Sequence, residues 1–116
     1  MSDAASPAPR DERADRKGRA PGYREFTDRR AGMIHAMDGG LWLHRHVWKG
    51  RPMAHLVSVD RELLLEYGRA VGLTPDRLQF KPLKDPRTGI RRDAWHWDLV
   101  GGYLPPRPAI GPGARR

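Results

Sequence analysis

The apolar residues of this chain are concentrated in its middle, and this limits the size of any folded core. Residues 1–32 are rich in Ala, Pro, Arg and Asp, with almost no large apolar side chain before Tyr23. The segment from residue 105 onward is rich in Pro, Gly and Arg. Such compositions are typical of segments that build no packed core. We therefore expect a disordered tail over residues 1–32, one domain over residues 33–104 and an extended tail over residues 105–116.

A domain of about 70 residues has a narrow margin of stability, typically about 3–5 kcal/mol unless a metal, a partner or a disulfide adds to it. The chain has no cysteine, which excludes disulfides, thiolate metal sites and cysteine nucleophiles. The N-terminus lacks the apolar stretch of a signal peptide. No segment approaches the roughly 20 apolar residues of a membrane span. We expect a cytoplasmic protein without a membrane segment.

The chain is strongly basic. It contains 22 Lys or Arg against 14 Asp or Glu, a net charge of +8 at pH 7. Most of this excess lies after residue 30, on the expected domain and the C-terminal end. Such a balance favours contact with polyanions. Nucleic acid is therefore a candidate partner, and the alternative is an arginine-rich protein with an ordinary basic surface.

Alternating apolar residues and turn residues predict several short strands. The predicted strands cover residues 33–37, 41–48, 55–59, 78–80 and 90–100. A polar loop over residues 81–89 is expected before the last strand, because Asp85-Pro86-Arg87-Thr88-Gly89 has strong turn chemistry.

One amphipathic helix is predicted over residues 60–71. Its apolar stripe falls at i, i+4, i+7 and i+8, on Leu63, Tyr67, Ala70 and Val71. Ser58 or Asp60 can cap its first turn, and Gly72 stands where a left-handed C-cap is needed. A strand, this helix and a further strand suggest a βαβ unit. The expected fold is a single small α/β domain with a short mixed sheet and one main helix.

Four residues in or beside the predicted strands form the candidate site. Asp38 follows the first strand, His55 begins another, and His96 and Asp98 share one face of the last. Imidazole and carboxylate groups suit Zn, Mn or Fe(II), and a bound metal could generate hydroxide for ester hydrolysis. A metal-free version would use His55 or His96 as a general base. The alternative is that both acids cap turns and both histidines make structural hydrogen bonds.

The order of short motifs resembles a known family. In chain order the motifs are residues 34–38 ending in Asp38, Gly50-Arg51, His55-Leu56, Val71-Gly72-Leu73, Leu78-Gln79 and His96-Trp97-Asp98. This pattern is similar to the bacterial and phage domain-of-unknown-function family 4031, over about residues 33–99. The resemblance supports the fold and the choice of Asp38, His55, His96 and Asp98, and it implies no particular reaction.

A second histidine pair and an aromatic, basic surface are weaker candidates. His44 and His46 would share one face of a strand and could hold a metal, although the flanking Trp42 and Trp48 favour packing or stacking there. Tryptophans beside cations can hold single-stranded nucleic acid; the alternative is that at least two of the four fill the core. The basic residues chosen for nucleic-acid contact are Arg51, Lys81, Lys84, Arg91 and Arg92.

Two functions remain open from the sequence. The first is a small metal-dependent or His/Asp-dependent hydrolase-like domain, acting on nucleic acid, with a divalent metal as its cofactor. The second is a non-catalytic basic module that binds nucleic acid or a protein partner.

Overall fold

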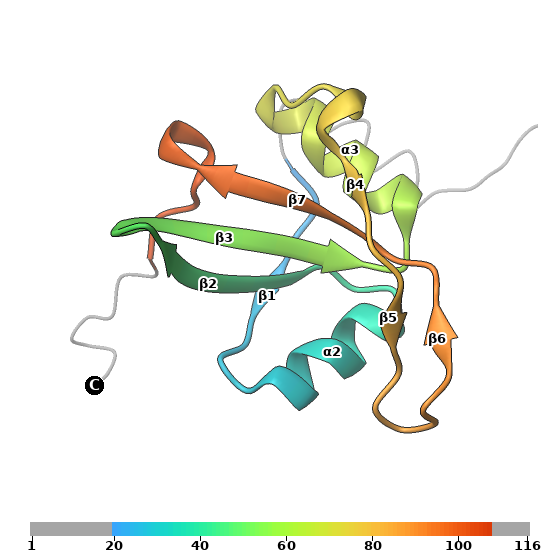
Figure 1. Cartoon of the computed structure of the whole chain (residues 1–116). Helices are drawn as coiled ribbons and strands as arrows, with labels where there is room; N and C mark the ends of the chain where they lie inside the picture. Colours follow the sequence, from blue (N-terminus) through green and yellow to red (C-terminus); the bar gives the residue numbers. More distant parts are fainter. Residues whose placement is uncertain (1–19, 108–116) are drawn as a thin grey trace, which may run out of the picture.

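A computed structural model describes residues 20–107 of the chain. Five strands form one mixed sheet in the order β1-β2-β3-β7-β4, and two short strands form a second sheet (Figure 1). The elements are β1 (Arg24–Glu25), α2 (Arg29–Met37), β2 (Trp42–Trp48), β3 (Arg51–Ser58), α3 (Arg61–Val71), η1 (Pro75–Arg77), β4 (Gln79–Phe80), β5 (Leu83–Lys84), β6 (Arg91–Arg92), β7 (Trp95–Val100) and η2 (Gly101–Tyr103). The predicted α/β fold with a mixed sheet is confirmed.

The centre of the sheet is antiparallel. β2 and β3 form a hairpin whose turn residues, Lys49 and Gly50, both have positive φ, as a two-residue turn between twisted strands requires. β7 lies antiparallel to both β3 and β4. β3 and β4 therefore point the same way, and α3 connects them. This is the predicted βαβ unit, with β7 inserted between its two strands.

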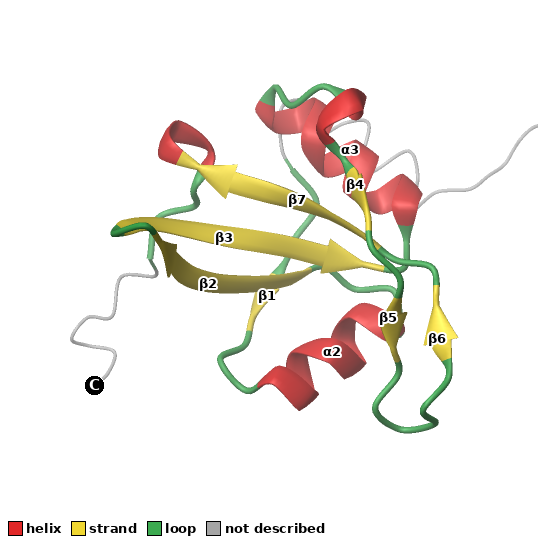
Figure 2. Ribbon diagram, in the orientation of Figure 1, coloured by secondary structure: helices red, strands yellow, loops and turns green. Residues whose placement is uncertain are grey.

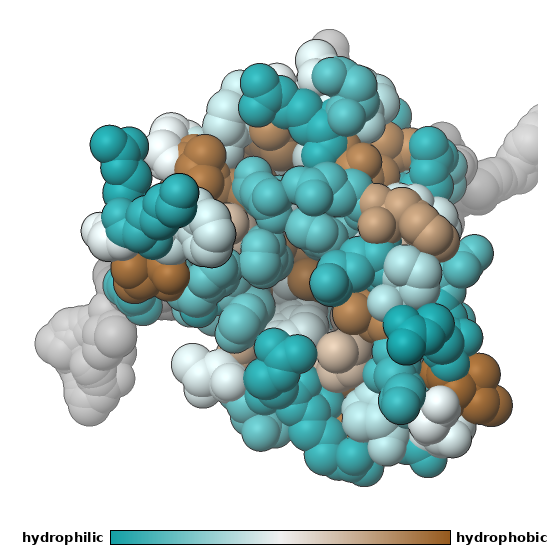
Figure 3. All heavy atoms as spheres, viewed as in Figure 1, coloured by the Kyte–Doolittle hydropathy of each residue, from teal (hydrophilic) through white to brown (hydrophobic). Residues whose placement is uncertain are grey.

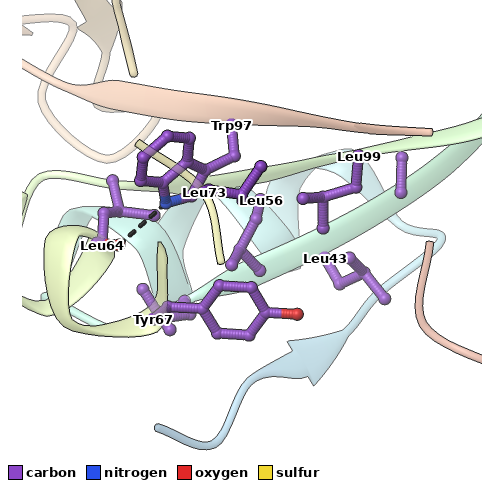
Figure 4. Packing of buried hydrophobic residues seen from close by; sticks show 9 residues of the cluster. Leu43, Leu56, Leu64, Tyr67, Leu73, Trp97 and Leu99 are labelled. Atoms are coloured by element: carbon purple, nitrogen blue, oxygen red, sulfur yellow. Dashed lines mark hydrogen bonds between the residues drawn. The ribbon is translucent and has the colours of Figure 1, made fainter. Parts of the chain in front are cut away.

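The two helices lie on opposite faces of the sheet (Figure 2). α3 covers the face that carries Leu43, Leu56, Trp97 and Leu99, and these residues form the main core with its Leu64 and Tyr67 (Figure 4). The indole N–H of Trp97 is satisfied inside this core because it donates to the backbone oxygen of Leu64 at 2.8 Å.

The ends of α3 follow the sequence signals closely. The Asp60 carboxylate accepts the backbone N–H of Leu63 at 3.0 Å, and this caps the first turn. Gly72 has φ of 91° and forms the left-handed C-cap, a conformation that costs glycine no Cβ clash. A short helical turn follows, the 3-10 helix η1.

The strand predicted over residues 33–37 is wrong, because this segment belongs to helix α2. Asp28 caps the helix by accepting the N–H of Ala31 at 2.9 Å. Gly32 and Ala36 then fall on one buried side, and a Cβ on Gly32 would lie 2.0 Å from the Trp42 ring. α2 can thus lie directly on the indole, covering the Trp42 end of the sheet face opposite α3. The helix was not predicted because it begins at Arg29, before the short apolar run over residues 33–37.

The expected boundaries of the domain also differ from the structure. β1 and the first turn of α2 precede residue 33, where a tail was expected. Arg45 ties both ends of the described chain to β2: it pairs with Glu25 at 2.8 Å and donates to the backbone oxygens of Pro105 and Pro106. The remaining tail predictions concern residues 1–19 and 108–116, which lie outside the described residues.

The polar loop predicted over residues 81–89 contains a strand, β5, which pairs with β6. Asp85 organises the turn between them. Its carboxylate accepts the backbone N–H of Arg87 at 2.9 Å and two N–H groups of the Arg87 guanidinium, both at 3.1 Å. The same guanidinium reaches Asp38 at 3.0 Å, so the turn of this hairpin is joined to the end of α2.

Replacing Gly68 by Ala tests how closely α3 approaches the sheet. A Cβ at this position would lie 2.4 Å from Cζ2 of Trp97, a side chain that is fully buried. Gly-to-Ala inside a helix normally stabilises by about 1 kcal/mol, whereas overpacking a core costs about 1–3 kcal/mol. We expect Gly68→Ala to lower the urea midpoint. The control is Arg69→Ala at the exposed neighbouring position, which should change the free energy of unfolding by less than about 0.5 kcal/mol. A higher midpoint for Gly68→Ala would contradict this packing.

Asp85 should make the fold sensitive to acid. Hydrogen bonds from the Arg87 guanidinium and backbone N–H hold the pKa of Asp85 below its ordinary value of 3.8. A lowered folded-state pKa gives stability that is present above the unfolded value and lost as the pH falls through the folded one. We expect Asp85→Asn to lower the melting temperature at pH 7 and to flatten its decline below about pH 4. The exposed Asp93→Asn should leave the steep decline unchanged, and an equally steep profile for Asp85→Asn would refute this role.

Candidate metal centre

Strand pairing brings two histidines and one aspartate together on the sheet face opposite α3. His55 lies directly across from Asp98 in the β3–β7 ladder, and His96 precedes Asp98 by two residues on β7. Residues two apart on a strand face the same side. The sequence analysis placed His55 at the beginning of its strand, and this is wrong: β3 begins at Arg51, so His55 lies in its middle.

The three side chains meet within ligand distance. His55 Nε2 lies 3.2 Å from Asp98 Oδ1, and His96 Nδ1 lies 3.1 Å from the same oxygen. One ligand atom from each residue falls within 4.8 Å of the other two. Ligand atoms bound to one Zn²⁺ at about 2.0–2.2 Å are themselves roughly 3–3.6 Å apart. Within residues 20–107 this is the one group of three such side chains, and it could hold a metal ion.

Gln79 fixes the orientation of the carboxylate. Its amide Nε2 donates to Asp98 Oδ2 at 2.7 Å, so Oδ1 is turned toward the two imidazoles. Gln79 stands on β4 opposite His96, and the βαβ connection through α3 therefore supplies this contact. Partners of this kind orient metal ligands and raise metal affinity in known sites.

Two buried imidazole nitrogens, His96 Nδ1 and His46 Nε2, lack a hydrogen-bond partner, and only His96 belongs to the candidate ligand group. His96 Nδ1 is shielded from solvent and lies 3.1 Å from Asp98 Oδ1. The two atoms are close, but they are not aligned for a hydrogen bond. Buried polar atoms are nearly always satisfied. A cation seated between His55, His96 and Asp98 would satisfy this nitrogen through its lone pair.

The electrostatics keep both imidazoles neutral near pH 7. Burial lowers the pKa of His96, and Lys81 lowers it further, while Asp98 acts in the opposite direction. Burial also lowers the pKa of His55 against the opposing effect of Asp98, with a smaller contribution from neighbouring histidines. Neutral imidazole is the form that binds metal. The pair is therefore ready to coordinate a metal at physiological pH.

The group lies in a cleft of about 520 Å³ between the sheet, α2 and the β5 segment. The cleft carries two cationic side chains, Arg29 and Lys81, and a single acid, Asp98. Figure 3 shows mainly hydrophilic side chains in the middle of this view, between α3 and α2, with apolar ones in small separate groups. The surroundings of the candidate site thus favour an anionic ligand.

His44 and His46 share the face of the candidate site, as predicted. Their rings continue a row that runs from Trp42 to His96, with centroid separations of 5.3, 5.9, 4.6 and 5.0 Å along Trp42, His44, His46, His55 and His96. Neither His44 nor His46 joins the group within ligand distance. They pack beside the candidate site, which is the alternative that the flanking tryptophans favoured, and within residues 20–107 no group of three ligand side chains includes them.

Asp38 lies apart from the other three predicted site residues. It ends α2, where its backbone N–H bonds to the oxygens of Ile34 and Ala36, and its carboxylate pairs with Arg87. It is not a member of the group that could hold a metal. The prediction of Asp38 as a ligand followed from the mistaken strand over residues 33–37. Asp38 instead caps the C-terminal end of α2, which agrees with the alternative that this acid has a capping role.

The tryptophans divide between core and surface. Trp42 and Trp97 are buried, as expected if two of the four fill the core, while Trp48 is 60% exposed. Among the basic residues chosen from the sequence, Lys81 lines the cleft, and Arg92 is occupied by the backbone oxygen of Met37. Arg51, Lys84 and Arg91 are exposed outside the cleft lining.

Two functional positions were missed by the sequence analysis. Arg29 falls in the segment expected to be a tail, and only the Asp28 cap signal could have included it. Gln79 belonged to a matched motif without an assigned role. Its position opposite His96 depends on the pairing of β4 with β7, which the sequence does not show.

No family model, curated protein or solved structure matches this chain. Within residues 20–107 no helix has the length and apolarity needed to cross a lipid bilayer.

Proposed function

We propose that this domain binds one divalent metal ion through His55, His96 and Asp98 and hydrolyses a phosphate ester at that ion. The observation that carries the proposal is the convergence of two imidazoles and a carboxylate in an open cleft that Arg29 and Lys81 line. Three protein ligands with a free coordination position are typical of catalytic rather than structural metal sites.

The chemistry follows from this ligand set. Two imidazoles and one carboxylate suit Zn²⁺, Mn²⁺ or Fe²⁺. An ion held there would lower the pKa of a bound water, which supplies hydroxide near neutral pH. The chain's own part is to hold His55 and His96 neutral, to orient Asp98 through Gln79, and to bind the anionic group of the substrate at Lys81.

An anionic substrate fits the lining of the cleft. Arg29 and Lys81 stand in the cleft with the site, and Asp98 is expected to be neutralised by the ion. The excess of positive charge on the whole chain adds long-range attraction for polyanions. The family resemblance supports the same positions, since His55, His96 and Asp98 fall in its His-Leu and His-aromatic-Asp motifs.

A metal-free reaction is the second candidate. Asp98 lies between two imidazoles at hydrogen-bonding distances, an arrangement in which the carboxylate orients a histidine base. The unsatisfied His96 Nδ1 favours the metal, because a base oriented by Asp98 would donate a well-aligned hydrogen bond from that nitrogen.

Metal binding should raise the melting temperature of the protein. Binding to the folded state at about 100 times the dissociation constant adds about 2.7 kcal/mol, which for a domain of this size is about 10 °C or more. We expect such a shift with at least one of Zn²⁺, Mn²⁺ or Fe²⁺. Asp98→Asn and His55→Gln should abolish it, and Gln79→Ala should weaken metal affinity about 10- to 100-fold.

The matched control is His44→Gln, since His44 lines the same cleft and lies outside the ligand group. This variant should keep the full metal-dependent shift. If wild type shows no shift with any of these ions, or if His44→Gln and Asp98→Asn lose it equally, the proposed site is wrong.

Hydrolysis can be measured with a chromogenic phosphodiester. We expect metal-dependent turnover that chelation abolishes and that Asp98→Asn reduces to the uncatalysed rate. Lys81→Gln should raise KM more than it lowers kcat, because its ammonium contacts the anion rather than the metal. Turnover that persists in excess chelator and is lost in His96→Gln would instead establish the metal-free base.

A further inference from the structure

A second cleft of about 740 Å³ adjoins the first across the candidate site. The two clefts share four residues of one sheet face and its edge, namely His46, His55, Gln79 and Asp98. Two of the proposed metal ligands, His55 and Asp98, therefore lie where the clefts meet, and the third, His96, lines the first cleft. A groove that runs past the reacting position on both sides suits a chain-like substrate better than a small one.

The far cleft ends in an exposed aromatic platform. Trp48, at the end of β2, is 60% exposed and lines this cleft together with Met53 and Val100, the latter 51% exposed. The Lys49 ammonium lies over the Trp48 ring, 5.4 Å from its centroid, and Arg51 stands opposite Trp48 in the hairpin. The groove thus has, on this side, an exposed indole with one cation over its ring and another beside it.

Cationic side chains occur on both sides of the proposed ligands. Arg77 lines the far cleft, and Arg29 and Lys81 line the near one. The acids in the groove are Asp98, which the ion would neutralise, and Asp76 beside Arg77. A polyanion could therefore contact cations before and after it crosses the site.

We propose that the groove binds single-stranded nucleic acid, with a base stacked on Trp48 and the backbone crossing His55 and Asp98 toward Lys81 and Arg29. This rests on the proposed function and specifies its substrate class. An exposed indole can stack only on an unpaired base, whereas duplex recognition depends on grooves and backbone. A protein that covered Trp48 and Val100 would bury the same apolar surface, but it would give no reason for cations along the whole groove.

The test is the affinity for a short fluorescent oligo-dT, measured by anisotropy in excess chelator. Stacking on one aromatic contributes about 1–3 kcal/mol per base, so we expect Trp48→Ala to weaken binding about 5- to 150-fold, with Trp48→Phe intermediate. The matched control is Val47→Ala, because Val47 is 67% exposed on the neighbouring position of the same strand and faces the other side of the sheet. That variant should bind as wild type does.

Electrostatic contacts predict a second readout. Wild-type affinity should fall with salt, and Lys81→Gln should reduce the slope of log affinity against log salt by about 0.7. Equal affinities of Trp48→Ala and Val47→Ala, preference for duplex over single strand, or salt-independent binding would each overturn the proposal. Salt-independent binding would indicate a protein-docking surface instead.

The oligonucleotide experiment separates this inference from the proposed hydrolase. Wild type in excess chelator should still bind oligo-dT, while its metal-dependent cleavage is lost. Binding by wild type without any metal-dependent thermal shift would refute the metal centre and support the groove. Metal binding and turnover of the small phosphodiester, without Trp48-dependent binding of oligo-dT, would refute the groove and support the metal centre.

Discussion

The pairing register of β3 with β7 determines both the core and the candidate site. In this register Leu56 lies opposite Trp97, and His55 lies opposite Asp98. Side chains alternate between the two faces of a strand, so a slip of one residue would exchange the faces. It would move Trp97 into water and Asp98 under α3. The burial of Trp97, with its indole hydrogen bond to Leu64, therefore fixes the position of the catalytic candidates on the other face.

Unequal coverage of the sheet explains why the site is accessible. α3 closes one face over a continuous apolar cluster, while α2 covers only one end of the other, around Trp42 and Val57. The open remainder carries histidines and Asp98 at its centre, with Trp48, Met53 and Val100 toward its far end. Gly32 is essential to this arrangement, because it lets α2 approach the Trp42 indole. The groove thus results from a short helix on a longer sheet.

The sequence predicted those parts of the structure that depend on local patterns. The caps at Asp60 and Gly72 and the alternation through His96 and Asp98 were sufficient to place α3 and the faces of β7. Helix α2 was missed because residues 33–37, apolar except for His35, are too few to show a distinct period. Asp38 was chosen because helix α2 was predicted as a strand. The inclusion of Gln79 could not be predicted, since it depends on which strands are neighbours. Strand order is a property of the whole chain, set by contacts between residues distant in sequence.

The contacts of Arg45 have a consequence for the order in which the domain can be completed. Its guanidinium meets Glu25 near the beginning of the described chain and the backbone oxygens of residues 105 and 106 near its end. During synthesis the first partner is made long before the others. Arg45 can therefore acquire its last two acceptors only after β7 and residues 105 and 106 have been synthesised. The hydrogen bond to Pro105 spans 60 residues, so this arginine must wait for nearly the whole described chain before all its acceptors are present.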